Sequence, residues 1–378
     1  MSGNITAAVC GVGTTDYGRL PGQSAYDLGL QALRAALDDA GLALSEVDGL
    51  IVNRIPSYQR FAELAGHDPD YVLTTPGQGR FSGICIDTAK ALVESGRCRT
   101  VALVYGNSGR SDGMTYGGKD ESAYGSEGRM WFPCGMTSPG AFHALMMQRH
   151  MHEFGTTPEQ MAHVPITFRR HAAHNPKAVM REEFDLDGYM NARPICDPLK
   201  LLDYCLINDG GAALIVTGAD RAADLRKPPV HIRGSALRTA FAGSTFPPED
   251  YWYAPLNEAA MRGFAEAGLD RSDMDALMVY DNFTPAVLFS LEGCGYAPRG
   301  ESGAWVSEGH LSLGGSLPAN TSGGHLSESY LQGWALNIEA VLQIRGECGA
   351  RQVAGARNVH YVAAAPVCSS IVYSGDAS

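Results

Sequence analysis

The sequence lacks long apolar segments and leader-like features. It contains no run of about 18 uninterrupted apolar residues, and its first residues, MSGNITAAVCGVG, show no basic stretch followed by an apolar one. We therefore expect a chain that does not cross a membrane and that works in the cytoplasm.

Positive charge and paired cysteines are also scarce. Lys and Arg number 29 against 41 Asp and Glu, a net charge of −12, so no basic stripe is available to neutralise nucleic-acid phosphates. A local cluster of positive charge could still hold an anionic group. The nine cysteines are irregularly spaced with no CxxC pair, which fits a reducing compartment and argues against a structural metal site. We expect neither nucleic acid nor a metal ion as a ligand.

An internal repeat is the most informative positive feature. AGLALSEVDGLIVN (Ala40 to Asn53) and AGLDRSDMDALMVY (Ala267 to Tyr280) align without a gap at an offset of 227 residues. Each copy follows a segment of helical period, and Gly41 or Gly268 stands where that helix would end. A short apolar strand comes next in both copies. The pattern predicts one helix–turn–strand unit that is used twice.

The rest of the chain predicts an α/β fold built from two pseudo-symmetric halves. Continuous apolar strands such as RTVALVYG and GGAALIV alternate with helix-period segments, which is typical of sheets covered on both faces. We place the N-terminal half at 1–226 and the C-terminal half at 227–378. The longer, more polar stretch at about 107–197 is interpreted as a loop or cap insertion over a pocket.

Five segments spread along the chain carry the motifs of one known family. They read, in order, SGICIDTAKALVESGRCRTVALVYG, PEQMAHVPITFRRHAAHNPKA, CLINDGGAALIVTGADRAADL, VYDNFTPAVLFSLEGCGYAPRGE and NTSGGHLSESYLQGWALNIEAVLQIRGECGARQV. Together they resemble the sterol-carrier-protein type of the thiolase superfamily. The resemblance implies the thiolase fold, in which two βαβαβαββ halves form a layered αβαβα arrangement, and it implies at least a homodimer.

Departures from that family indicate different chemistry. A thiolase needs a cysteine thiolate at the N-terminus of a buried helix. The matching position here falls at Gly79-Arg80, and the nearby Cys85 lies in an apolar run typical of a core thiol. The two histidines of the family's motifs are replaced by Tyr280, in YDNF, and by Tyr330, in SESYLQG. Loss of the nucleophile and of both histidines is hard to reconcile with acyl transfer.

Tyrosines at both histidine positions resemble a subgroup, the thiolase-like aldolases of steroid side-chain degradation. That resemblance implies retro-aldol cleavage of a bulky β-hydroxyacyl-CoA to a ketone plus acetyl-CoA or propionyl-CoA. It also implies a small partner subunit with an OB-fold and a zinc ribbon, bound to a homodimer within a heterotetramer. Coenzyme A would enter as part of the substrate, and no covalently bound cofactor is implied.

Retro-aldol chemistry requires a base at the β-hydroxyl, a site for the enolate oxygen and an acid for the α-carbon. Tyrosine, with a reference pKa of about 10, is a poor base at neutral pH unless its anion is stabilised, and it is a fair acid. We assign Tyr330 as base and Tyr280 as acid, and the reverse stays open. The candidate supporting residues are Asp281, Asn282 and His325, with the backbone of Gly323 and Gly324. The candidate CoA contacts are Arg80, Ser82 and Gly83.

Two other functions remain open at this point. One is a thiolase-like acyltransferase that uses a non-standard cysteine such as Cys85 or Cys294. The other is a non-catalytic subunit that binds an acyl-CoA without turnover. Each tyrosine also has a plainer interpretation as a packing residue, and a tyrosine that ends a strand, such as Tyr280, is usually half-buried for that reason.

Overall fold

The first half of the chain forms the expected βαβαβαββ unit. The computed structural model describes residues 6–77, 81–114, 135–136, 138–240 and 248–376. The elements of this half are β1 (Ala7–Thr14), α1 (Ala25–Ala40), β2 (Gly49–Asn53), α2 (Tyr58–Ala65), β3 (Tyr71–Thr75), α3 (Phe81–Glu94), β4 (Thr100–Asn107) and β7 (Gly210–Gly218). Strand β2 runs parallel to β3 and β4, whereas β7 is antiparallel to β4 and β1, and the strand order is β3-β2-β4-β7-β1.

The second half repeats this order, except that the counterpart of β3 is reduced to an isolated bridge. Its elements are β8 (Val230–Thr239), α9 (Tyr253–Ala267), β9 (Ala276–Val279), α10 (Thr284–Gly293), α13 (Trp334–Arg345), β10 (Asn358–Ala363) and β11 (Val367–Ser374). The strand order β8-β11-β10-β9 mirrors that of the first half. Where β3 would have its counterpart, the described residues contain a single parallel bridge between Leu277 and Ala319. Glycine and serine are frequent around Ala319, and glycine in particular extends strands poorly.

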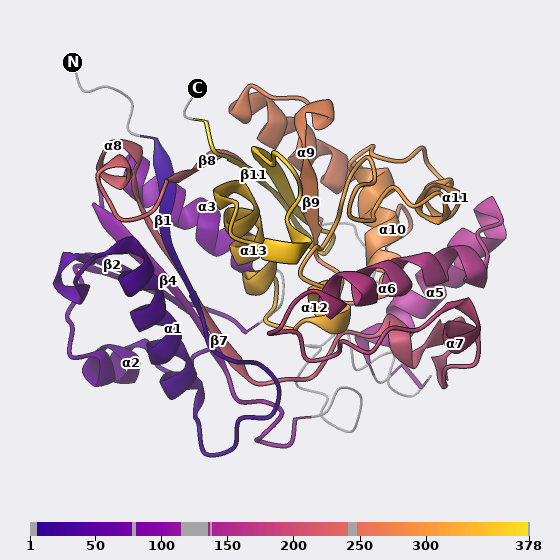
Figure 1. The fold of residues 1–378 in the computed structure, drawn as a ribbon, viewed down its shortest axis with the longest axis horizontal. Helices are drawn as coiled ribbons and strands as arrows, with labels where there is room; N and C mark the ends of the chain where they lie inside the picture. The colour runs from indigo at the N-terminus through magenta and orange to yellow at the C-terminus, as the bar shows by residue number, and fades with distance from the viewer. Residues whose placement is uncertain (1–5, 78–80, 115–134, 137, 241–247, 377–378) are drawn as a thin grey trace.

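The two halves stack in layers and share a core. Helix α1 packs on β1 and β7, while α9 packs on β8 and β11. Helices α3 and α13 lie between the halves, as the centre of Figure 1 shows, and each contacts strands of both. The central hydrophobic cluster includes Ile86 of α3, Leu336 of α13 and Tyr361 of β10, all fully buried. Strands β1 and β8 pair through Ala8–His231 and Val9–Val230, which joins the halves into one nine-stranded sheet. The predicted thiolase fold is confirmed.

The internal repeat is confirmed in its details. Gly41 and Gly268 end α1 and α9 in the left-handed region, with φ of 73° and 66°. Each is followed by a single 3-10 turn, Leu44–Glu46 or Arg271–Asp273, and then by the central strand β2 or β9. The boundary near residue 227 falls in the link between α8 (Ala219–Ala223) and β8, and as a division into domains it stays a prediction.

The predicted insertion packs against the second half. Its described elements are α5 (Pro139–Phe154), α6 (Pro158–Ala173), α7 (Leu186–Met190) and β5 (Pro194–Cys196), and β5 pairs with β6 (Leu199–Lys200) just beyond the predicted bound. Helix α6 contacts α10, α11 (Ser302–Ser307) and α12 (Gly324–Ser327), on the right of Figure 1. The insertion therefore lies beside the loop that carries His325. Among the described residues, no helix is long and apolar enough to span a bilayer.

Candidate active site

The structure brings Tyr280 and Tyr330 into direct contact. Tyr280 follows β9, where its N–H donates to the carbonyl of Val362 at 2.9 Å, and its side chain is 3% exposed. Tyr330 lies between α12 and α13, and its N–H donates to Asn208 Oδ1 at 2.6 Å. The two hydroxyl oxygens are 2.9 Å apart although 50 residues separate them in the chain. Burial, and then the neighbouring Tyr280, raise the pKa of Tyr330 well above its usual 10, so this phenol is neutral at physiological pH.

His325 packs against both phenol rings. Its ring centroid lies 4.7 Å from that of Tyr280 and 5.1 Å from that of Tyr330, edge-on in both cases. The N–H of Gly333 donates to His325 Nε2 at 3.0 Å, which leaves the ring proton on Nδ1. Nδ1 lies 3.2 Å from Asp281 Oδ1 but makes no hydrogen bond with it. Burial lowers the pKa of His325 to about 3, so the imidazole is uncharged where it packs against the two tyrosines.

Asp281 holds α12 in place. Its Oδ1 accepts the N–H of His325 at 2.9 Å and its Oδ2 accepts the N–H of Leu326 at 3.2 Å. Burial raises the pKa of Asp281 to about 7, against the opposing effect of these backbone bonds. Asp281 therefore holds the start of α12, the short helix that carries His325. The carbonyl of the next residue, Asn282, accepts the N–H of Cys205 at 3.0 Å, and Asn282 Oδ1 is buried without a hydrogen-bond partner.

Gly323 and Gly324 form a tight turn at the start of α12. Their φ angles are 105° and 60°, and a Cβ on Gly324 would lie 2.3 Å from Asp281 Oδ2. Glycine is therefore required by both conformation and space. The N–H of Gly323 donates to the carbonyl of Asn320 at 2.8 Å, and that of Gly324 to Ser322 Oγ at 3.4 Å. Both N–H groups are hydrogen-bonded within the turn, so the direct effect of the turn is to shape the wall of the site.

The N-terminal end of α3 reaches the same place from the other half. Ser82 Oγ and Tyr361 Oη lie 2.9 Å apart, and both residues are fully buried. A Cβ on Gly333 would lie 2.4 Å from each of these oxygens and 3.4 Å from Tyr280 Cδ2. The structure therefore places Ser82 beside the tyrosine pair, in the interior. Gly83 is also buried, and a Cβ there would lie 2.5 Å from Ser369 Oγ.

One predicted CoA contact cannot be placed, and several contacts were missed. Arg80 lies outside the described residues. Tyr361, Gly333 and Asn208 were not identified from the sequence, although each touches the site. Tyr361 had one usable signal, because a lone phenol in the apolar strand NVHYVA needs a polar partner.

The cysteines that could replace the thiolase nucleophile are buried thiols. Cys85 is fully buried with Thr75 Oγ1 at 3.4 Å, and burial raises its pKa to about 12. Cys294 and Cys368 are also fully buried, and burial raises the pKa of both thiols. A thiol in such surroundings holds little thiolate at neutral pH and is a weak nucleophile. Within the described part of the chain, no group of three or more His, Cys, Asp or Glu could hold a metal ion.

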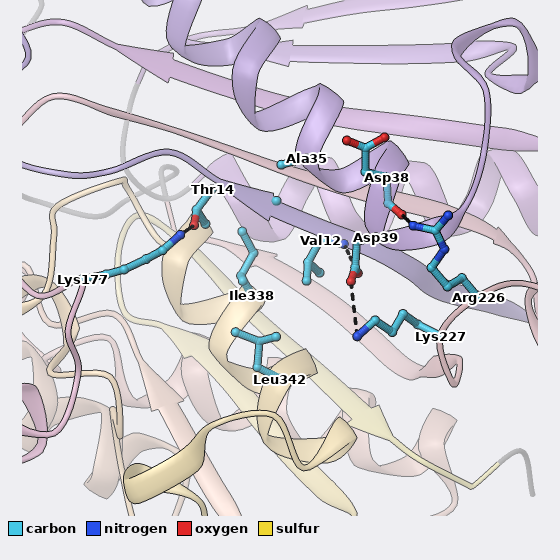
Figure 2. Close-up of a pocket in the computed structure, with 11 residues that line it drawn as sticks. Val12, Thr14, Ala35, Asp38, Asp39, Lys177, Arg226, Lys227, Ile338 and Leu342 are labelled. Atoms are coloured by element: carbon cyan, nitrogen blue, oxygen red, sulfur yellow. Dashed lines mark hydrogen bonds and ion pairs between the residues drawn. The ribbon is translucent and has the colours of Figure 1, made fainter.

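A groove of about 570 Å³ lies at the seam of the two halves, lined by β1, α1, α13 and residues 177, 226 and 227. Figure 2 shows Lys177 and Lys227 reaching in from opposite sides. Lys177 Nζ donates to Thr14 Oγ1 at 2.7 Å, and Lys227 Nζ lies 3.8 Å from Asp39 Oδ1. No candidate site residue lines this groove, so it is separate from the tyrosine pair.

Comparisons with known proteins agree with this geometry. The family model described as "Thiolase C-terminal domain-like" matches residues 244–372. The chain is 34% identical over 358 residues to a steroid side-chain-cleaving aldolase of Thermomonospora curvata, covering 90% of each. It is 31% identical to the 17-hydroxy-3-oxo-4-pregnene-20-carboxyl-CoA lyase of Mycobacterium tuberculosis, covering 93% of this chain and 95% of that protein.

A solved structure titled Ltp2-ChsH2(DUF35) aldolase extends the match to three dimensions. It superposes with a TM-score of 0.90 at 32% identity and covers 99% of this chain and 98% of that one. Near-complete coverage at this identity, in sequence and in structure, excludes a likeness limited to one domain. The chain belongs to the thiolase superfamily, among its thiolase-like carbon–carbon lyases.

Proposed function

We propose that this chain catalyses retro-aldol cleavage of a bulky β-hydroxyacyl-CoA, a steroid side-chain CoA thioester, to a ketone plus acetyl-CoA or propionyl-CoA. The observation that carries the proposal is the pair of tyrosine hydroxyls 2.9 Å apart, in a fold whose candidate nucleophiles Cys85 and Cys294 are buried thiols with raised pKa values. The names of the two relatives support the substrate class, since both are cleavage enzymes and one is named for a steroid CoA thioester.

The contact between the phenols supports a proton relay. A phenol whose pKa is raised above 10 is a poor base alone, but it can accept a proton while it passes its own to a neighbour. The substrate β-hydroxyl gives its proton to Tyr330 Oη, and Tyr330 gives its own to Tyr280 Oη. In the same step the bond between the α- and β-carbons breaks to leave a ketone and an enolate, and Tyr280 passes its own proton to the α-carbon as it receives that of Tyr330. Both tyrosines end the cycle neutral, as they began.

The same geometry assigns the supporting roles. Asp281 and the Gly323–Gly324 turn fix α12, and His325 keeps the two rings in place from the side. Because His325 is neutral, it adds no charge that would compete for the moving proton. The Ser82 and Tyr361 hydroxyls, 2.9 Å apart next to Gly333, are the candidate donors to the enolate oxygen, where negative charge develops.

Product analysis tests the reaction class. Incubation of the chain and its partner with a β-hydroxyacyl-CoA whose hydroxyl-bearing carbon lies in a ring should yield ketone and short acyl-CoA in equal amounts. The matching substrate without the hydroxyl should remain intact, because it has no proton to enter the relay. Binding of the hydroxylated substrate without any cleavage would instead identify a non-catalytic acyl-CoA-binding subunit.

A partner subunit is part of the proposal. The solved aldolase that superposes on this chain is titled as a complex with a DUF35 protein, which supports a small OB-fold and zinc-ribbon subunit here. We propose a homodimer of this chain within a heterotetramer. Co-expression followed by mass measurement of the purified complex should give two copies of each chain, and a stable, active chain without a partner would contradict it.

Acyl transfer through a non-standard cysteine predicts a trapped thioester, and we expect none. Incubation with a radioactive acyl-CoA followed by peptide mapping should leave all nine cysteines unlabelled, because Cys85 and Cys294 are buried thiols with raised pKa values. Cys85→Ala should keep kcat within about twofold of the wild type. An acyl group on either cysteine would replace the aldolase proposal with the acyltransferase.

A further inference from the structure

Glu328 joins three parts of the chain next to the tyrosine pair. It lies two residues before Tyr330 and is 6% exposed. Its Oε1 accepts Asn175 Nδ2 at 3.0 Å and its Oε2 accepts the Ser322 hydroxyl at 2.7 Å. Its own N–H donates to the carbonyl of Gly324 at 2.8 Å. The carboxyl group therefore connects the end of the insertion helix, the glycine turn and the segment that carries Tyr330.

The bonds around Glu328 form a directed chain. The Gly324 N–H donates to Ser322 Oγ, whose own proton then points to Glu328. Asn175 Nδ2 donates both to Glu328 and, at 3.0 Å, to the carbonyl of Ser322. The carbonyl of Glu328 accepts the N–H of Val179 at 3.0 Å. Removal of the carboxyl group would leave two buried donors without this acceptor, the Ser322 hydroxyl at the glycine turn and Asn175 Nδ2 just after α6.

From this arrangement, and resting on the proposed function, we propose that Glu328 is a positioning residue for the reaction: its carboxyl group sets where Tyr330 stands relative to Tyr280. The reaction depends on a 2.9 Å contact between two hydroxyls on different segments. Tyr280 is fixed to the sheet through β9, whereas Tyr330 lies in the segment after α12, which is held by Asn208 and by the bonds of the Glu328 carboxyl group. Small displacements of one partner in such a contact lower rates strongly.

The charged groups around Glu328 determine whether its carboxyl group is protonated or ionised at the pH of the reaction. Glu339 of α13 lies close by and pairs with Arg351, whose Nε and Nη2 are 2.9 and 3.0 Å from its two oxygens. Tyr17 and Cys348 also face the group. Within the described ranges, no cation forms an ion pair with Glu328 itself. Burial, and then Glu339, raise the pKa of Glu328 to about 8, so the carboxyl is protonated at pH 7 and becomes a buried anion beside Glu339 above pH 8.

Two variants of Glu328 separate positioning from mere stability. Glu328→Ala should lower kcat by about 10- to 100-fold with little change in KM, because binding surfaces stay while the hydroxyls move apart. Glu328→Gln mimics the protonated carboxyl, because its carbonyl can accept from Asn175 Nδ2 while its amide N–H donates to Ser322 Oγ, and it should keep kcat within about threefold at pH 7. The ratio of kcat for Glu328→Gln to wild type should rise by about tenfold between pH 7 and 9, as the wild-type carboxyl ionises. Asp87→Asn removes another carboxyl of raised pKa, on α3 and away from the pair, and its ratio should stay flat.

An activity-independent measurement keeps this inference distinct from the proposed reaction. Hydrogen exchange of the amides of residues 324–330 should be faster in Glu328→Ala than in the wild type, and unchanged in Glu328→Gln. Absence of cleavage by the wild type would overturn the reaction and leave the exchange result standing. Unchanged kcat in Glu328→Ala, equal loss in both variants, or a flat pH ratio for Glu328→Gln would each overturn the positioning role.

Discussion

Replacement of Tyr330 with phenylalanine should lower kcat by about 10² to 10⁴-fold, the usual contribution of a positioned acid–base group. The change removes one hydroxyl and therefore breaks the relay at its first step. The ring stays, so its edge-on packing against His325 at 5.1 Å is preserved and KM should change little. Tyr280→Phe should have a similar effect, because it removes the second hydroxyl of the same 2.9 Å contact. Steady-state kinetics on the purified complex measure both effects.

The double variant distinguishes a relay from two independent groups. If the hydroxyls act as one unit, Tyr280→Phe combined with Tyr330→Phe should cost about as much as either single change, rather than the product of both. Tyr251→Phe is a suitable control, because it also removes the hydroxyl of a buried tyrosine. That hydroxyl donates to Glu153 Oε2 at 3.0 Å and takes no part in the contact between Tyr280 and Tyr330. The control should keep kcat within about twofold. Near-normal turnover in both single variants would rule out the assigned roles.

Gly333→Ala should destabilise the protein by about 2–5 kcal/mol and abolish the packing of the site. Gly333 has a φ of 91°, which L side chains rarely adopt. The added methyl group would also lie 2.4 Å from both Ser82 Oγ and Tyr361 Oη, so α3, β10 or α13 must move. Urea unfolding, followed by circular dichroism, measures the change in the free energy of unfolding.

The matched control is Gly346→Ala at the other end of α13. Gly346 has a φ of 73°, but a Cβ there meets nothing within 4 Å. This variant carries the conformational strain alone and should cost about 1–2 kcal/mol. An equal loss in both variants would mean that crowding at Gly333 contributes nothing to stability.

The fold could be predicted from the sequence because its signals are short-range and occur twice. Gly41 and Gly268 end helices by a local conformation that glycine adopts easily, and apolar strands follow both at the same spacing. The tyrosine positions could be identified from motifs in the same way. Their 2.9 Å contact could not, since it depends on how the α12 loop folds against β9.

The surroundings of the pair were less predictable for a physical reason. Asp281 was predicted as a supporting residue, but its bonds to the N–H groups of His325 and Leu326 could not be predicted, because they depend on how α12 folds against β9. Ser82 stays a prediction as a CoA contact, but its 2.9 Å contact with Tyr361 could not be predicted, because it depends on how the two halves stack. Glu328 was passed over altogether, because its partner Asn175 lies 153 residues away and no local pattern links the two.

The repeat also makes Asn53 the counterpart of Tyr280 at an offset of 227 positions, since Asn53 ends β2 and Tyr280 directly follows β9. Asn53 donates to Thr75 Oγ1 at 2.9 Å and accepts the indole N–H of Trp334 at 2.9 Å. Trp334 is the first residue of α13 and follows Gly333, which lies beside Tyr280. Asn53, at the end of the first copy, therefore supports the start of the helix that packs next to Tyr280 of the second copy. In the proposed mechanism, one copy of the strand end therefore carries a catalytic tyrosine and the other serves as scaffold. Exchanging these two residues should therefore damage folding at one end and chemistry at the other.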